Sequence, residues 1–231
     1  MNNVPVMTID GPSGSGKGTV SRAAARALGW TLLDSGALYR LVALAGRRAG
    51  VQLDDETGLA RLAETADIAF GSTGSGGEVV RLDGKDVTSA IRTEEAGNDA
   101  SKVAALPGVR AALLERQRRF AVPPGLVADG RDMGTVVFPR AEVKIFLTAS
   151  AAERASRRYK QLKEKGVAAN LAALSLEIAE RDLRDSTRAA SPLVASADAV
   201  LLDTTGMSVD TVVERVLEVA RGRLSRGVLK K

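Results

Sequence analysis

The residues best suited to chemistry stand in one glycine-rich stretch near the start of the chain. It follows an apolar run over 4–9 and precedes helix-forming residues over 20–28. Glycines let a loop wrap closely around an anion, and the following helix N-terminus adds partial positive charge. Lys17 can reach the terminal phosphates of a nucleotide. The alternative is a glycine-rich turn that binds no ligand, and the position of this lysine disfavours it. We therefore predict a phosphate-binding loop made of Gly11, Pro12, Ser13, Gly14, Ser15, Gly16, Lys17, Gly18 and Thr19.

Magnesium would be the natural companion of such a loop. The hydroxyl expected directly after the lysine is replaced by Gly18, so either Thr19 or Ser15 can approach the metal. Asp129 follows an apolar run over 125–128, the position of a carboxylate that helps to hold Mg²⁺. We take Thr19 and Asp129 as candidate metal ligands. A polar turn with a local ion pair is the alternative for 129–132.

A second polar group follows the short apolar run over 31–33. Asp34 stands where a carboxylate can orient a phosphate acceptor or a metal-bound water. Ser35 can cap the next helix, and Arg40 in the second turn of that helix can reach an acceptor phosphate. The alternative is an N-cap followed by a surface arginine. All three residues are candidates for substrate binding.

A third group is rich in arginine and falls on two predicted helices, over 151–165 and 171–185. Spacings of three, four and seven residues put each set on one helix face. The sets are Arg154, Arg157 and Arg158, then Arg181, Arg184 and Arg188 with Asp182 and Asp185 between them. Cations stabilise the charge that spreads over a transferred phosphoryl group, so we expect a lid over a nucleotide, with Arg157 and Arg158 binding ATP. Two solvated helices held by salt bridges are the alternative.

The elements that must position these residues alternate along the chain. Apolar runs predict strands over 4–9, 31–33, 125–128, 143–147 and 199–202. Helices are predicted over 20–28, 37–48, 54–66, 93–106, 109–120, 151–165, 171–185 and 208–224. This alternation indicates a parallel sheet covered on both faces, with ligands beyond the carboxyl ends of the strands. Short pieces at 68–70, 78–82 and 87, separated by glycine-rich turns, predict a small antiparallel insert.

Composition narrows the chemistry further. The 231 residues contain no cysteine and no histidine, which excludes thiolate nucleophiles, imidazole bases and Ser–His triads. A net charge of +5 suits phosphorylated ligands, and 3% aromatic residues leave few platforms for stacking single-stranded nucleic acid. We interpret the basic stretch 221–231 as a solvated helix end and tail, with a nucleic-acid arm as the alternative. Without a long apolar run or room for a signal peptide, we expect a cytoplasmic protein.

Four of these stretches together resemble the bacterial cytidylate kinase family. They are 9–19, 33–40, 128–139 and 180–185, and the similarity extends over nearly the whole chain. The Gly-Lys-Gly-Thr sequence at 16–19 is also the form found in adenylate-kinase-like nucleoside monophosphate kinases. The insert near 70–88 resembles the extra small sheet of the bacterial enzymes. The resemblance thus implies an α/β phosphate-loop kinase with a five-stranded parallel sheet flanked by helices, an antiparallel insert and a helical lid.

The resemblance also implies an activity and a set of residue roles. The activity is transfer of the ATP γ-phosphoryl group to CMP or dCMP with Mg²⁺, in pyrimidine nucleotide metabolism. By this resemblance, Ser101, Arg110 and Asp132 meet the cytosine edge, and Arg40 and Arg131 hold the acceptor phosphate. Arg181, Asp185 and Arg188 serve the ribose and the closed lid. The catalytic set implied is Lys17, Arg131, Arg181, Asp185 and Arg188, while Asp182 fits a lid salt bridge.

The expected organisation has core, acceptor-binding and lid regions. The core covers 1–34, 101–150 and 190–231, the acceptor-nucleotide region with the β insert covers 35–100, and the arginine-rich lid covers 151–189. Two alternatives stay open. One is another small-molecule phosphate-loop kinase acting on UMP, AMP or a non-nucleotide. The other is a GTPase-like switch or nucleic-acid-binding regulator, against which stands the lack of an Asn-Lys-x-Asp signature. We expect a monomer with nucleotide ligands, no stable nucleic-acid partner and no membrane association.

Overall fold

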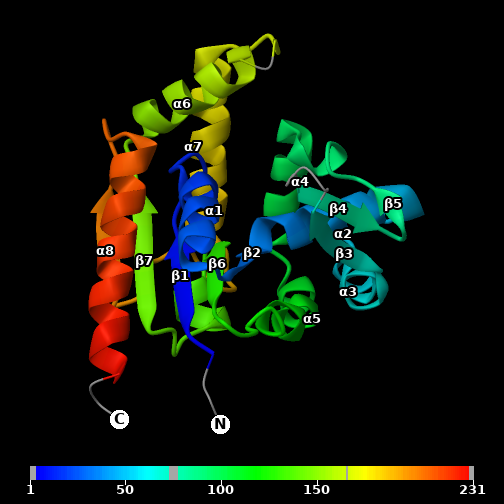
Figure 1. Cartoon of the computed structure of the whole chain (residues 1–231). Helices are drawn as coiled ribbons and strands as arrows, with labels where there is room; N and C mark the ends of the chain where they lie inside the picture. Colours follow the sequence, from blue (N-terminus) through cyan, green and yellow to red (C-terminus); the bar gives the residue numbers. More distant parts are fainter. Residues whose placement is uncertain (1–3, 73–77, 165, 229–231) are drawn as a thin grey trace. The chain divides into compact units, whose positions relative to one another are not determined.

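The chain forms two compact units in the computed structural model, which describes residues 4–72, 78–164 and 166–228. One unit consists of Met1–Asp34 and Arg118–Lys231, and the other of Ser35–Gln117. Figure 1 shows the elements of both units in the colours of the sequence. Within the described ranges, none of the helices combines the length and apolarity that a membrane span requires.

The first unit is built on a five-stranded sheet of order β2-β6-β1-β7-β8. All neighbouring strands in it are parallel. Its strands are β1 (Val6–Asp10), β2 (Thr31–Asp34), β6 (Leu126–Gly130), β7 (Val143–Thr148) and β8 (Val200–Asp203). The register places Asp34 opposite Asp129 and Asp10 opposite Gly130, so polar residues meet at one edge of the sheet. The predicted parallel sheet is confirmed, with each strand within about two residues of its expected bounds.

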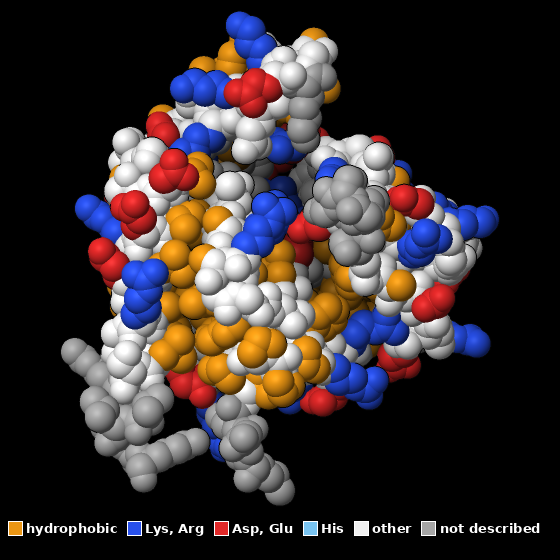
Figure 2. All heavy atoms as spheres, in the orientation of Figure 1, with side chains coloured by type: hydrophobic (Ala, Val, Ile, Leu, Met, Phe, Trp, Pro, Cys, Tyr) orange, Lys and Arg blue, Asp and Glu red, His pale blue; other side chains and the backbone are white. Residues whose placement is uncertain are grey.

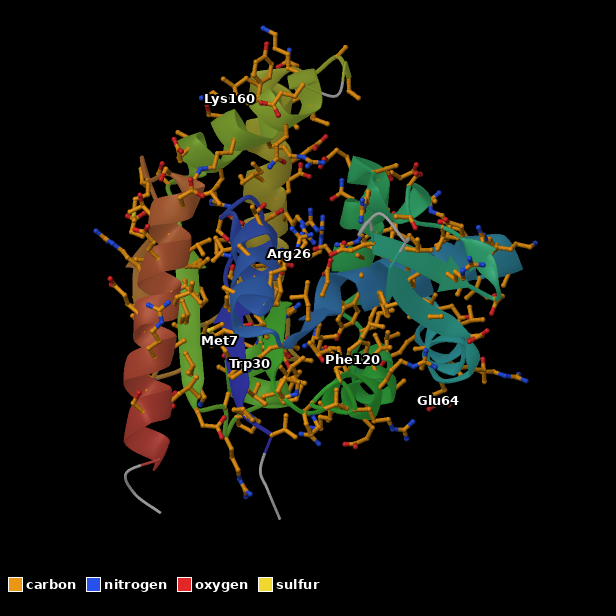
Figure 3. The ribbon with its side chains drawn as sticks, viewed as in Figure 1. Met7, Arg26, Trp30, Glu64, Phe120 and Lys160 are labelled. Atoms are coloured by element: carbon orange, nitrogen blue, oxygen red, sulfur yellow. The ribbon has the colours of Figure 1, made fainter. Side chains whose placement is uncertain are left out.

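Two helices cover one face of this sheet, α1 (Lys17–Leu28) and α8 (Val209–Val228). Apolar side chains of both helices pack with those of alternate strand residues, because successive residues of a strand point to opposite faces. The core includes Met7 and Ile9 of β1 with Val20, Val212 and Val216. Figure 3 labels Met7 on β1 and Trp30 where α1 gives way to β2. Each Å² of apolar surface that these groups remove from water contributes roughly 25 cal/mol to stability. This packing fixes α1 and the loop before it.

The opposite face carries polar strand residues and packs against a short π-helix, η2 (Met133–Val137). Thr8 and Asp10 of β1 and Lys144 of β7 alternate with the core residues and are buried. A Cβ at Gly134 would lie 2.9 Å from Thr8 Oγ1 and 3.3 Å from Lys144 Cδ, so η2 approaches the sheet closely. The sequence analysis did not predict this π-helix. Such elements are rare and occur often at functional sites.

The predicted lid helices are α6 (Ala151–Glu164) and α7 (Leu171–Thr187). They pack against one another and lie at the top of the view in Figure 1. Asn170 caps α7, since its Oδ1 accepts hydrogen bonds from the N–H groups of Ala172 and Ala173. Ala155, Leu174 and Ile178 are buried. Side chains of both charges cover the top of the molecule in the space-filling view (Figure 2).

The second unit combines helices with the predicted antiparallel insert. Its sheet has the order β3-β4-β5, with strands β3 (Ile68–Ser72), β4 (Glu78–Leu82) and β5 (Lys85–Asp86). The third strand, β5, therefore ends one residue before Val87, the position at which we predicted it. The helical elements are α2 (Ser35–Ala49), α3 (Glu56–Thr65), the 3-10 turn η1 (Ala90–Arg92), α4 (Glu94–Val103) and α5 (Pro107–Arg118). A separate core that includes Leu41, Leu82 and Ile91 holds α2 to the sheet. Residues 73–77 of the predicted turn lie outside the described residues.

Candidate active site

The loop between β1 and α1 has the backbone that a phosphate-binding loop requires. Gly14 and Gly16 have φ angles of 75° and 89°, a region that residues with a Cβ rarely occupy. A Cβ at Gly11 would collide with the carbonyl oxygen of Leu147 at the end of β7. The Gly16 carbonyl accepts hydrogen bonds from the N–H groups of Thr19 and Val20, both at 3.1 Å, as α1 begins. The helix N-terminus with its positive dipole end thus lies directly at the loop.

Two lid arginines hold this loop through its backbone carbonyls. Arg154 Nη1 donates to the Ser13 carbonyl at 3.0 Å, and Arg157 Nη1 donates to the Ser15 carbonyl at 3.3 Å. Arg157 also donates to the Thr204 hydroxyl at 3.0 Å and to the Thr204 carbonyl at 2.5 Å. Guanidinium forks satisfy several acceptors in fixed geometry. Helix α6 is therefore fastened to the phosphate loop and to the segment after β8.

Lys17 and Asp129 are charged groups that interact with one another at the loop. Lys17 Nζ donates to the Pro12 carbonyl at 3.2 Å. Asp129 is buried near the end of β6, and its Oδ2 lies 3.2 Å from the position that a Cβ at Gly18 would take. Burial lowers the pKa of Lys17, and the charge of Arg131 acts in the same direction. Burial raises the pKa of Asp129, against the opposing effect of Lys17.

The hydrogen bonding of this cluster is incomplete. Within the described ranges, Asp129 Oδ1 and Ser15 Oγ are buried without a hydrogen-bond partner. Buried polar atoms are nearly always partnered, so such atoms beside a phosphate loop suggest a ligand. Thr19 lies exposed in the first turn of α1, while Ser15 is buried in the loop. No cluster of three or more carboxylates or other metal-binding side chains occurs in the part of the chain that the structure describes.

Arg131 and Asp185 form the ion pair that joins β6 to lid helix α7. Arg131 Nε donates to Asp185 Oδ2 at 2.9 Å, and the Asp185 side chain is 5% exposed. Burial acts to raise the pKa of Asp185, but the charge of Arg131 and its hydrogen bond prevail and lower the pKa. Arg181 and Arg188 add to this lowering, so four of the five predicted catalytic residues share one electrostatic environment. Arg188 Nε also donates to the Ser191 carbonyl at 2.6 Å.

The other lid residues are divided between the two helices. Arg154 Nη1 and Nη2 donate to the two carboxylate oxygens of Asp182 at 3.0 and 2.5 Å, which confirms that Asp182 forms a lid salt bridge. Arg154 is buried, although the sequence analysis assigned it no individual role. Arg158 donates to Gln161 within α6 at 3.1 Å. The shared face expected for the α6 arginines therefore splits between loop contacts and a contact within the helix.

The second unit holds the predicted residues of the acceptor region. Ser35, predicted to cap this helix, is instead the first residue of α2, and Arg40 lies in its second turn as expected. Ser101 is buried on α4, which packs against α2. Arg110 of α5 places its guanidinium carbon 5.6 Å from the ring centroid of Tyr39 and donates to the Ala104 carbonyl at 3.0 Å. These contacts bring Arg110 and α2 together, through an aromatic residue that the site prediction did not include.

Sequence reasoning also missed residues that support the site in the first unit. Asp10 accepts hydrogen bonds from the N–H groups of Met133 and Gly134, both at 2.8 Å. Burial raises the pKa of Asp10 to about 7, against the effect of these two bonds. Thr204 donates to the Ser15 and Thr148 carbonyls at 3.3 and 3.0 Å. An aspartate at the end of an apolar strand was the one available signal for Asp10, and Thr204 had none.

These features define a class of protein. A glycine-rich loop joins a central parallel strand to a helix, a lysine lies in the loop, and a buried carboxylate ends the neighbouring strand. An arginine-rich helical pair is fastened to that loop. Together they define a phosphate-loop α/β fold of the kind that binds nucleotide phosphates.

Comparison with known proteins specifies the family. A family model described as cytidylate kinase matches residues 7–222. A cytidylate kinase of Stutzerimonas stutzeri is 61% identical over 94% of this chain and 96% of its own length. Cytidylate kinases of Pseudomonas aeruginosa and Shewanella denitrificans are 60% and 57% identical, over 93% and 96% of this chain and 94% and 98% of their own lengths. A solved gluconokinase from Sinorhizobium meliloti is 17% identical and covers 100% of both chains, but its TM-score of 0.48 supports no conclusion.

The chain therefore belongs to the cytidylate kinase family. Membership makes it an ATP-dependent nucleoside monophosphate kinase and confirms the resemblance seen in the sequence. It also favours the cytidylate kinase interpretation over another small-molecule kinase and over a switch or nucleic-acid-binding regulator.

Proposed function

We propose that this chain transfers the γ-phosphoryl group of ATP to CMP or dCMP, which yields ADP with CDP or dCDP. The observation that carries the proposal is the phosphate loop with Lys17 and the incompletely bonded Asp129 beside it, in a chain of this family. Phosphoryl transfer spreads negative charge over the transferred oxygens and needs positioned cations rather than a strong base. The acceptor is itself a phosphate anion, so the absence of histidine is no obstacle.

On the donor side, the loop from Gly11 to Thr19 would hold the ATP phosphates, with Lys17 on the bridging and terminal oxygens. The lowered pKa of Lys17 would rise when phosphate charge arrives, because an opposite charge favours the charged form. Arg157 and Arg158 would contribute to ATP binding from α6. Arg181 and Arg188 would add positive charge from the α7 side, with Asp185 holding Arg131 in place.

Magnesium fits the residues present. Asp129 Oδ1 is a buried oxygen without a hydrogen-bond partner in the described part of the chain, and it lies beside the loop. In kinase sites Mg²⁺ usually takes one or two carboxylates, with phosphates and water completing the octahedron. Asp129 and Thr19 would hold the ion, either directly or through water, and Ser15 is the other hydroxyl at hand. When bound, the ion neutralises phosphate charge during transfer.

We assign the recognition of the acceptor to the residues that the family resemblance implies. Arg40 and Arg131 are assigned to its phosphate, and Asp34 and Ser35 to its orientation. Ser101, Arg110 and Asp132 are assigned to the cytosine edge, and Arg181, Asp185 and Arg188 also to the ribose. The supporting structural facts are the burial of Ser101 and Asp132 and the fixed guanidinium of Arg110. We place the activity in the cytoplasm, in a monomer without a stable nucleic-acid partner.

The test is base specificity at Asp132. Cytosine offers an amino donor where uracil offers a carbonyl acceptor, so a carboxylate attracts one base and repels the other. A hydrogen bond to a charged group contributes about 1.5–3 kcal/mol, so CMP should be preferred over UMP by roughly 10- to 150-fold from this contact. In Asp132→Asn the amide can rotate to donate to uracil. We expect kcat/KM for CMP to fall and the CMP-to-UMP ratio to shrink by at least about tenfold.

The experiment measures kcat/KM for CMP, dCMP and UMP with ATP and Mg²⁺. Asp86→Asn is the control, an exposed aspartate that accepts a hydrogen bond from Thr88 N–H at the small sheet, and it should leave the ratio unchanged. If both rates fall together in Asp132→Asn while the ratio persists, Asp132 serves phosphate or metal geometry rather than base recognition. If the wild type shows no turnover with CMP or dCMP, the proposed function is wrong.

A further inference from the structure

The N-terminus of η2 is capped by the side chain of Asp10 and not by that of its own N-cap residue, Asp132. The first N–H groups of a helix have no partner within the helix, and the side chain of the N-cap residue commonly accepts from them. Asp132 is the N-cap residue of the π-helix η2, and aspartate is among the best capping residues. Its side chain nevertheless makes no capping hydrogen bond. Only its carbonyl takes part, accepting from the N–H groups of Val136 and Val137 at 2.9 and 3.2 Å.

The missing cap is supplied from β1. Asp10 Oδ1 accepts from Met133 N–H, and Asp10 Oδ2 accepts from Gly134 N–H, each at 2.8 Å. Asp10 is 5% exposed, so these bonds are shielded from competing water. Both carboxylate oxygens are engaged with the first two N–H groups of η2. The cap is therefore complete without the side chain of Asp132.

The surroundings leave this turn little freedom. Asp10 pairs with Gly130 in the sheet, two residues before Asp132. A Cβ at Gly134 would meet Thr8 Oγ1 at 2.9 Å and Asp10 Oδ2 at 3.4 Å, so η2 lies tightly on β1. Asp10 is also the last residue before Gly11 and the phosphate loop. One strand end thus fixes both the start of the phosphate loop and the start of η2.

We propose that Asp10 is a positioning residue, which caps η2 in place of Asp132 so that the carboxylate of Asp132 serves acceptor recognition. This inference rests on the proposed function, because it concerns the same base contact. Asp10 would touch neither nucleotide and would act only through the turn that carries Asp132. Acceptor specificity would then depend on a residue of the strand that leads into the donor loop.

The discriminating variant is Asp10→Asn. Its amide can accept from one N–H of η2 but presents a donor to the other, so the turn should shift. We expect the CMP-to-UMP ratio of kcat/KM to fall by about tenfold, as for partial loss of a charged hydrogen bond at Asp132. ATP binding measured without an acceptor should stay within about threefold of wild type, because the loop's own contacts are untouched. A merely structural residue would lower stability and rates without changing the ratio.

A double variant tests whether Asp10 acts through Asp132. If it does, Asp10→Asn combined with Asp132→Asn should show the same CMP-to-UMP ratio as Asp132→Asn alone, because the second change finds nothing left to disturb. Multiplying effects would mean that Asp10 acts independently, which overturns the proposal. The matched control is Asp55→Asn, which alters another aspartate that accepts a backbone hydrogen bond at a helix start, from Gly58 N–H at 2.9 Å. It should leave the ratio unchanged.

Gly134→Ala provides a second route if Asp10→Asn folds poorly. Its Cβ would press on Thr8 and on Asp10, so it should move η2 and lower the same ratio. The proposal is overturned if either folded variant keeps the wild-type ratio, or if both variants unfold at the assay temperature, since Asp10 would then serve stability alone. A wild type that does not prefer CMP would defeat the proposed function instead, and that result is obtained before any Asp10 variant is made.

Discussion

Two neighbouring strands each carry a buried aspartate at or next to their last residue, and the two carboxylates differ in their hydrogen bonding. Asp10 of β1 and Asp129 of β6 are both buried, and burial raises the pKa of each carboxyl. Asp10 has both oxygens bonded to backbone N–H groups of η2. Asp129 has an oxygen with no hydrogen-bond partner among the residues that the structure describes. One carboxylate has both oxygens bonded within the fold, and the other keeps an unbonded oxygen, to which we assign the proposed metal.

The difference has an energetic meaning. A buried carboxylate oxygen without a hydrogen-bond partner is costly, even where cations such as Lys17 lie near the carboxylate. A bound cation or phosphate-bound metal would repay that cost, so the incomplete bonding of Asp129 marks a place where binding supplies what folding does not. The two backbone hydrogen bonds of Asp10 offset part of the cost of burying its carboxylate. Three predictions sharpen this distinction, taken from the largest expected effect to the smallest.

Removing the cation beside Asp129 should have the largest effect. Lys17→Ala should reduce kcat by about 100-fold or more, by analogy with removal of one transition-state donor. The fold should persist, because Lys17 makes one backbone contact, to the Pro12 carbonyl. Lys160→Ala is the control, since Lys160 is an exposed lysine of α6 (Figure 3). Steady-state kinetics and thermal melting of both variants provide the test, and near-normal turnover in Lys17→Ala would contradict the role of the loop.

Neutralising Asp129 should separate metal use from stability. We expect Asp129→Asn to raise the Mg²⁺ concentration for half-maximal activity by roughly 10- to 100-fold. Its Tm at pH 7 should not fall, because an amide is less costly to bury than a carboxylate with an unsatisfied oxygen. Asp10→Asn should lose about 1–3 kcal/mol, or roughly 2–12 °C in Tm, because it leaves one buried N–H group of η2 without an acceptor. Activity titrations with Mg²⁺ and melting curves decide the matter, and an equal loss of Tm in both variants would erase the distinction.

The sheet and the phosphate loop could be predicted from the sequence, but the different hydrogen bonding of Asp10 and Asp129 could not. Strand and helix positions follow from apolar runs, and the loop follows from glycine spacing around Lys17, so the sheet and loop were predictable. Asp10 and Asp129 both follow buried strands, and local pattern cannot separate them. Their difference comes from η2, whose N–H groups lie more than a hundred residues along the chain from Asp10.

Lid arginines show the same limit. Spacing correctly put Arg154 and Arg157 on one face of α6, but it could not specify what that face meets. Their acceptors are carbonyls of Ser13 and Ser15, with Asp182 and Thr204 as further partners. These are contacts between elements distant in sequence, which depend on how α6 packs on the loop. Periodicity gives the direction of a side chain, and tertiary packing gives its partner.

Asp185 differs from both Asp10 and Asp129, because its carboxylate is bonded to a cation, Arg131, and not to backbone N–H groups. Its replacement gives the smallest expected effect. Burial acts to raise the pKa of Asp185, but the charge and hydrogen bond of Arg131 lower it below the ordinary value. For a lowered pKa, the stabilisation is present above the unfolded value of about 3.9 and is lost as pH falls through the folded value. Asp185→Asn should therefore lower Tm by a few degrees at pH 7, and the difference should narrow toward pH 3.

The contribution of Asp10 to stability should change with pH in the opposite direction. One set of melting curves can therefore compare Asp10 with Asp185. Because burial raises its pKa to about 7, the folded protein holds a proton that the unfolded chain has released between about pH 4 and 7. Its contribution to stability should therefore decrease as pH rises through that window. Melting curves of wild type, Asp10→Asn and Asp185→Asn from pH 3 to 8 would resolve both trends. If the Asp185→Asn difference stayed constant down to pH 3, the ion pair with Arg131 would not be what holds this carboxylate.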